Sequence, residues 1–271
     1  MKDSSSYKMR ICKVILLCVI YMAVCYLIRC GIRVLKSDSV YSYWDYVVNK
    51  SAYALVAICF LFIFGNKQIF MLPKDRKNTG KIVTGFYYCV MILLIVVYIV
   101  SAVLQTGKYK CSFSEVCGYI CYVMLIGFGE EVFFRGLCFN KLIDYPRSRG
   151  EYQFAYILNG VLFGVIHFYP LLFDNDLSTF LVQMVLATFW GIVFACIYEE
   201  CKNIWIAILA HGLYDFRVGM DKGVFGLEVV TKTMPLLELK AIIFFVLLIG
   251  SLILSFRFIR RIEVDNDKIV A

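Results

Sequence analysis

The residues of this sequence that could do chemistry begin with a ten-residue stretch, Gly127–Gly136, which reads GFGEEVFFRG. It places Glu130, Glu131 and Arg135 among bulky apolar residues, where charged groups are costly. On a helix Glu131 and Arg135 are four residues apart, so they share a face and can form an ion pair. Glu130 points about 100° away and cannot share that partner well. We therefore predict that Glu131 and Arg135 support the structure and that Glu130 faces a cavity.

Two histidines lie in similarly apolar segments, and the chain contains no others: His167 and His211. Asp215 follows His211 by four residues, so on a helix its carboxylate can orient the imidazole or share its proton. A single buried histidine is more often a packing residue, but two of them with a buried glutamate on a third helix favour a functional site. The candidate catalytic residues are therefore Glu130, His167, His211 and Asp215. The alternative is that all these groups only join helices together.

A glutamate and imidazoles in a site of low dielectric can hydrolyse an amide. That reaction needs a base for the water, a donor for the oxyanion and an acid for the leaving amine. Glu130, His167 and His211 are also a plausible zinc set, although the HExxH spacing is missing. We expect a metal-independent site without a cofactor, with zinc bound by these three residues as the alternative.

The elements that position these residues must be membrane helices. The chain of 271 residues is 61% hydrophobic and only 18% charged, an excess of apolar residues that one soluble domain cannot bury. We predict an all-α, polytopic transmembrane helix bundle of about eight spans: 11–34, 52–71, 82–104, 115–139, 153–173, 178–198, 203–219 and 236–258. The predicted regions are an N-terminal two-span region at 1–80, a core at 81–220, and the last span with a cytoplasmic tail at 221–271.

The basic residues indicate topology rather than nucleic-acid binding. The net charge is +8, but the lysines and arginines sit in short runs between apolar segments and not on one soluble face. Most of them fall on the side that holds both termini, which predicts cytoplasmic N- and C-termini.

The depth of the site residues in the membrane follows from counting ~1.5 Å per residue from the ends of the predicted spans. By this count Glu130, His167 and His211 lie at a common depth. Gly160 and Gly164 form a G-x-x-x-G face that permits close helix packing beside His167.

Three motifs in this order resemble the CPBP family, which comprises CAAX-processing endopeptidases and bacterial bacteriocin-processing and abortive-infection-type membrane proteins. EEVFFR (Glu130–Arg135) matches EExxxR, FGVIH (Phe163–His167) matches FxxxH, and HGLYD (His211–Asp215) matches HxxxN/D. The resemblance covers about residues 80–220. It implies an intramembrane endopeptidase in a bacterial plasma membrane that cleaves a peptide or a lipidated protein, by CAAX-type or leader-peptide processing.

Carried over residue by residue, the resemblance implies that Glu130 and His167 activate a water and that His211 and position 215 stabilise the oxyanion. Glu131 and Arg135 would support the site. Well-studied CAAX proteases have Asn where this chain has Asp215, and an ionised Asp cannot donate a hydrogen bond. Asp215 must then be protonated or must orient His211.

The alternative function is a non-catalytic immunity or peptide-binding protein of the same family. Proton-coupled transport is disfavoured, because the sequence shows none of the inverted repeats typical of transporters. The sequence does not indicate the substrate or the oligomeric state.

Overall fold

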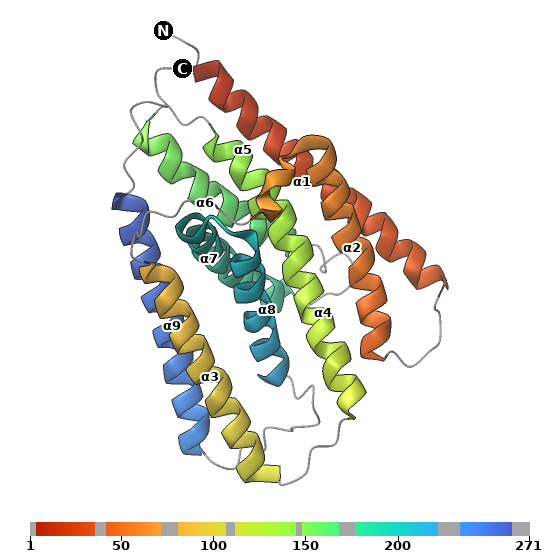
Figure 1. Ribbon diagram of the computed structural model, residues 1–271, viewed down its shortest axis with the longest axis vertical. Coiled ribbons are helices and arrows are strands. Elements are labelled where there is room, and N and C mark those ends of the chain that lie inside the picture. The colour runs from red at the N-terminus through yellow and green to blue at the C-terminus, as the bar shows by residue number, and fades with distance from the viewer. Residues whose placement is uncertain are drawn as a thin grey trace.

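The computed structural model describes residues 4–35, 42–71, 81–106, 112–144, 148–167, 177–221 and 234–261. Within these ranges every regular element is helical, which confirms the all-α prediction (Figure 1). The α-helices are α1 (Ser4–Leu35), α2 (Tyr43–Phe64), α3 (Ile82–Thr106), α4 (Phe113–Glu131), α5 (Asn140–Ile143), α6 (Arg149–Ile166), α7 (Leu177–Cys201), α8 (Ile204–Asp221) and α9 (Met234–Arg261). The short 3₁₀ helix η1 (Lys67–Phe70) follows α2, and the π-helix η2 (Val132–Phe139) continues α4.

Six segments in the described residues are long and apolar enough to cross a membrane, and they correspond to six of the eight predicted spans. These segments are Tyr7–Ile32, Tyr43–Phe64, Ile82–Val100, Phe113–Ile143, Phe180–Cys201 and Leu239–Arg261. The second predicted span begins earlier than expected, because its helix starts at Tyr43 rather than near residue 52.

The other two predicted spans, 153–173 and 203–219, contain the helices α6 and α8, each of 18 residues. These helices are less apolar than the six, and α8 includes Asp215. α6 ends at Ile166, sooner than predicted, and residues 168–173 of that span lie outside the described residues. The two segments that bring the histidines to the site are thus less apolar than the six candidate spans, and both helices contain charged residues.

Local sequence explains where several helices begin. Ser42 and Ser112 each cap a helix, accepting a hydrogen bond from the backbone N–H three residues later. Asp45 and Glu115 complete the two capping boxes by accepting from the backbone N–H of the serine. α2 and α4 therefore start with the same local signal.

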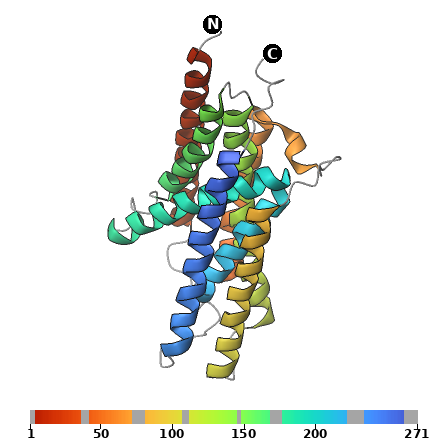
Figure 2. The same cartoon turned by 90° about the vertical axis from the view of Figure 1, so that its left-hand side faces the viewer.

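α4 lies between α2 and α8, while α3 and α9 lie side by side in both views (Figures 1 and 2). α2 and α4 run parallel, because the rings of Tyr43 and Tyr119 pack at one end and Ala54 meets Gly129 further along. α4 and α8 run antiparallel. The hydroxyl of Tyr119 donates to the carbonyl oxygen of Asp215 over 2.9 Å, and Gly127, further along α4, meets Ile208, which is earlier in α8. These directions agree with the predicted alternation of spans.

Glycines allow the helices near the site to approach closely. A Cβ at Gly127 would lie 2.9 Å from the carbonyl oxygen of Ile208 in α8. A Cβ at Gly160 would lie 2.8 Å from the carbonyl oxygen of Thr188 in α7. The predicted G-x-x-x-G face of α6 therefore packs against the backbone of α7.

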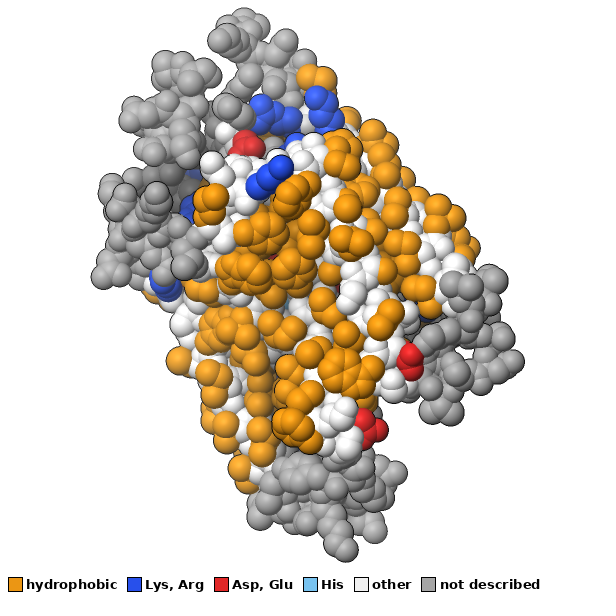
Figure 3. Space-filling model, turned by 45° about the vertical axis from the view of Figure 1, so that its right-hand side comes forward, with side chains coloured by type: hydrophobic (Ala, Val, Ile, Leu, Met, Phe, Trp, Pro, Cys, Tyr) orange, Lys and Arg blue, Asp and Glu red, His pale blue; other side chains and the backbone are white. Residues whose placement is uncertain are grey.

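The outer surface of the described residues is broadly apolar, as expected for a protein in lipid. Figure 3 shows apolar side chains over most of one face, with lysine and arginine side chains gathered toward the end that holds both termini in Figure 1. Exposed apolar residues occur on several helices, among them Leu27, Val48, Ile63 and Ile242. This distribution fits an integral membrane protein.

Candidate active site

The EEVFFR motif spans the junction between α4 and η2. Glu130 and Glu131 are the last two residues of α4, and Arg135 lies within the π-helix. A π-helix leaves carbonyl groups without their usual α-helical partners, and such segments often occur at functional sites. The amide of the buried Asn159 in α6 donates to the carbonyl oxygen of Phe134 over 3.0 Å. The sequence pattern contained no sign of this π-helix.

Glu131 is the centre of a buried polar network. Its Oε1 accepts hydrogen bonds from Nη1 of Arg135 and from Nδ1 of His211, each over 2.8 Å. Glu131 and Arg135 are both completely buried. The structure therefore has the predicted Glu131–Arg135 ion pair and adds the imidazole of His211 to it.

Arg135 ties the network to two further helices. Its Nη2 donates to the carbonyl oxygen of Gly191 in α7 over 2.8 Å. Its guanidinium lies 4.5 Å from the ring centre of Phe163 in α6, a distance typical of a cation–π contact. A charge at this depth is stable only with such partners, so the site holds α4, α6, α7 and α8 together.

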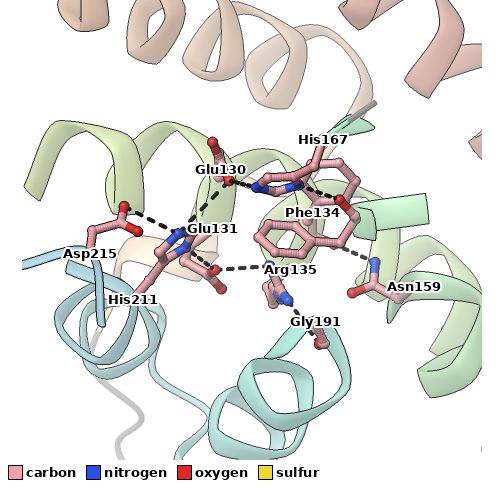
Figure 4. Close-up of polar contacts among 10 residues, drawn as sticks. Glu130, Glu131, Phe134, Arg135, Asn159, His167, Gly191, His211 and Asp215 are labelled. Carbon is pink, nitrogen blue, oxygen red and sulfur yellow. Dashed lines mark hydrogen bonds and ion pairs between the residues drawn. The ribbon is translucent and has the colours of Figure 1, made fainter. Parts of the chain in front are cut away.

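Glu130 points away from Glu131 and Arg135 and towards both histidines (Figure 4). Its Oε2 lies 4.0 Å from Nε2 of His167 and 3.8 Å from Nε2 of His211. It accepts no hydrogen bond from any described residue. The side chain is 23% exposed, whereas Glu131 has no exposed surface. The two adjacent glutamates thus have different environments, as the helical spacing predicted.

The backbone sets the tautomer of His167. Its Nδ1 lies 2.8 Å from the carbonyl oxygen of Phe163, and because a carbonyl only accepts, Nδ1 must carry the hydrogen. In the neutral ring, Nε2 is then an unprotonated acceptor directed at Glu130. His167 directly follows Ile166, the last residue of α6, and is the C-cap of that helix.

A hydrogen bond and a stacked aromatic ring fix the position of His211. Nδ1 bonds to Glu131, and the ring stacks on Phe194 of α7 with a centre separation of 5.0 Å. Asp215, which the spacing predicted as an orienting partner, lies 3.6 Å from Nε2. That is beyond hydrogen-bonding distance, so Glu131 and not Asp215 fixes the orientation of this ring in the described structure. The sequence missed this contact because Glu131 and His211 are 80 positions apart.

Glu130, His167 and Asp215 all open into one cavity of about 570 Å³. Its walls come from α1, α2, α4, α6, α7 and α8 and are rich in tyrosine: Tyr21, Tyr43, Tyr46, Tyr53, Tyr119 and Tyr122. A pocket that is mostly apolar, with a few convergent polar groups, is typical of a binding site. The first two helices therefore contribute to the site, which sequence reasoning did not anticipate.

The described residues contain no group of three or more His, Cys, Asp or Glu side chains arranged to hold a metal ion. Glu130 and the two imidazoles converge, but Nδ1 of each ring is already committed to Phe163 or Glu131. Zinc on these residues would use the two Nε2 atoms and a carboxylate oxygen of Glu130, so it stays an alternative for experiment.

A comparison with known protein families matches the part of the chain that carries this site. Residues 112–217 match the family model described as Rce1-like, type II CAAX prenyl endopeptidase Rce1-like. The match runs from the start of α4 into α8 and includes all six predicted site residues: Glu130, Glu131, Arg135, His167, His211 and Asp215. It confirms the resemblance to the CAAX endopeptidases and supports a membrane protease. No curated protein and no solved structure shows significant similarity to the chain.

Proposed function

We propose that this chain, an Rce1-like membrane protein by its residues 112–217, hydrolyses a peptide bond with a water activated by Glu130 and His167. The observation that supports this most directly is the position of Oε2 of Glu130, 4.0 Å and 3.8 Å from the Nε2 atoms of the two histidines. Polar groups at such separations can share one bridging water. The carboxylate is open to the cavity and otherwise unpaired among the described residues.

The chemistry follows from the donors and acceptors. Glu130, assisted by Nε2 of His167, takes a proton from the water, and the water oxygen attacks the carbonyl carbon of the substrate. The carbonyl oxygen becomes an oxyanion. When the C–N bond breaks, the proton held by Glu130 or His167 passes to the leaving amine. No covalent bond to the protein forms at any step.

His211 is the proposed donor to the oxyanion. Its Nδ1 bonds to the carboxylate of Glu131, which stabilises the protonated ring. Its Nε2 lies near Glu130 and Asp215, which both line the cavity. The same logic orients histidine in serine-protease triads, where a carboxylate holds the ring without taking its proton. Arg135 donates a hydrogen bond to Oε1 of Glu131 and holds that carboxylate in place. Glu131 and Arg135 are thus positioning residues rather than catalytic ones.

The proposed substrate is a peptide or a lipidated protein that reaches the cavity at the membrane. The family description names a CAAX prenyl endopeptidase, and the apolar, tyrosine-rich walls suit an apolar peptide segment. Leader-peptide processing uses the same chemistry, so the termini of cellular proteins provide an unbiased test.

We expect Glu130→Gln to abolish cleavage, because an amide cannot take a proton from water, while the protein still inserts and folds. The measurement is a comparison of protein termini by mass spectrometry in cells that produce either form, followed by an in vitro assay with and without EDTA. Glu115→Gln is the matched control, since it makes the same change in α4 and glutamine can also complete a capping box.

If the protein termini in cells with Glu130→Gln are the same as in cells with wild type, the hydrolytic mechanism is overturned and the non-catalytic, peptide-binding alternative is favoured. Loss of activity in EDTA, with recovery on adding zinc, would replace the metal-independent mechanism with a zinc-dependent one.

A further inference from the structure

The cavity extends well beyond Glu130. On the side away from Arg135 it follows α2 and α4 towards their first residues, where Tyr43 packs on Tyr119 at 5.3 Å and Tyr46 on Tyr122 at 5.5 Å between ring centres. All four tyrosines line the cavity. A peptide bound with its scissile bond at Glu130 would therefore lie along this wall.

Lys50 of α2 lines the same wall. It precedes Ala54 by one helical turn, and Ala54 packs against Gly129, the neighbour of Glu130. At about 1.5 Å per residue, Lys50 therefore lies about 6 Å along the helix axis from the level of Glu130. This residue belongs to α2, outside the segment matched by the family model.

The ammonium group of Lys50 lacks a close counterion in the described part of the chain. Its contact there is with the ring of Tyr53, whose centre is 5.3 Å away. Asp215 lines the same cavity, but the described residues show no ion pair between it and Lys50. Arg29 also lines the cavity and has an interaction of its own. A cation at membrane depth is costly unless an anion joins it.

We propose that Lys50 is a specificity-determining residue that binds a carboxylate of the peptide substrate. This inference rests on the proposed hydrolase function, because it places the carboxylate relative to the bond that Glu130 attacks. Peptides supply carboxylates from the C-terminus or from acidic side chains, and Lys50 can bind either. An extended peptide advances about 3.3 Å per residue, so the carboxylate lies within about three residues of the scissile bond.

The test uses an S-farnesylated peptide ending in a C-a-a-X sequence, without acidic side chains, prepared as the free acid and as the C-terminal amide. A third peptide is amidated and carries one aspartate near the C-terminus. Each is assayed with wild type, Lys50→Met, Lys50→Arg and Lys67→Met. Lys67 is the matched control, because it also contacts an aromatic ring, that of Phe62 at 4.6 Å, but does not line the cavity.

We expect Lys50→Met to lower kcat/KM for the free acid about tenfold or more, mainly through KM, as one lost charge-assisted contact implies. The amide should be a poor substrate for wild type and should not respond to the substitution. Lys50→Arg should restore much of the loss, and Lys67→Met should have no effect. Recovery by the aspartate peptide would identify a side-chain carboxylate as an equivalent ligand.

Binding to the Glu130→Gln protein separates this inference from the proposed function. The dissociation constants of dye-labelled free acid and amide are measured with Lys50 present and with Lys50→Met added. Tighter binding of the acid that depends on Lys50 supports the inference even if wild type cleaves neither peptide. Equal affinities, or no binding of either form, overturn it even if cleavage depends on Glu130.

Discussion

Two adjacent glutamates have opposite environments in this protein. Glu131 is fully buried and accepts two hydrogen bonds, whereas Glu130 is partly exposed and accepts none from the described residues. The cause is the 100° rotation per residue of a helix, which turns one carboxylate into the bundle and the other into the cavity. At the residue scale, the division of roles is thus a matter of helical geometry that the spacing of Arg135 already indicated.

Asp215 is the residue whose role the geometry changes most. Because Glu131 already holds Nδ1 of His211, Asp215 is free to act on the substrate side of the ring, 3.6 Å from Nε2. It can stabilise an oxyanion only as a protonated donor. An asparagine in its place would donate at any pH.

We therefore expect Asp215→Asn to keep activity within about tenfold of wild type, while Asp215→Ala loses about 10²–10³ in kcat, as for one oxyanion donor. The measurement is kcat for the three proteins at one pH. Equal inactivity of the Asn and Ala variants would instead assign Asp215 to an electrostatic role that needs its charge.

At the scale of elements, the site depends on helices that touch backbone to backbone. Gly160 and Gly164 bring α6 against α7, and Gly127 brings α4 against α8. His167 comes one turn after this contact in α6, so the packing of α6 sets how far His167 lies from Glu130. The π-helix η2 adds a second constraint, because Asn159 of α6 bonds to its Phe134 carbonyl.

Gly160→Ala should destabilise the protein by about 1–3 kcal/mol, because the added methyl would lie 2.8 Å from a carbonyl oxygen of α7 and force the helices apart. Activity should fall with it, since His167 would shift. The measurement is the melting temperature in detergent together with peptide cleavage. Gly85→Ala in α3 is the matched control: nothing lies within 4 Å of its added Cβ, so we expect unchanged or slightly higher stability. Equal melting temperatures for the two variants would contradict the packing explanation.

At the scale of the whole molecule, the charge distribution predicts which side of the membrane holds the termini. The basic end seen in Figure 3 is the end of both termini, and basic loops face the cytoplasm. We expect a green fluorescent protein fused to the C-terminus to fluoresce and an alkaline phosphatase fused there to be inactive. Fusions truncated after Thr106, in the predicted outer loop, should behave in the opposite way. Active phosphatase at the C-terminus would reverse the predicted orientation.

The sequence by itself determined the class of the protein and the residues worth testing. Its apolar composition requires helices in lipid, and the rare ionisable residues at membrane depth identify Glu130, His167 and His211, because such groups are too costly to occur without a function. The spacing of four also determined the Glu131–Arg135 pair, since neighbours on one helix face interact whatever surrounds them.

Only the tertiary structure decided which groups meet across helices. Two hydrogen bonds join distant parts of the chain: one from His211 to Glu131 and one from Arg135 to the carbonyl oxygen of Gly191. Lys50 likewise reaches the cavity from α2. Periodicity describes one helix at a time and carries no information about the rotation and depth of its neighbours. Those are set by the close packing of glycines and aromatic rings, and that packing makes the cavity.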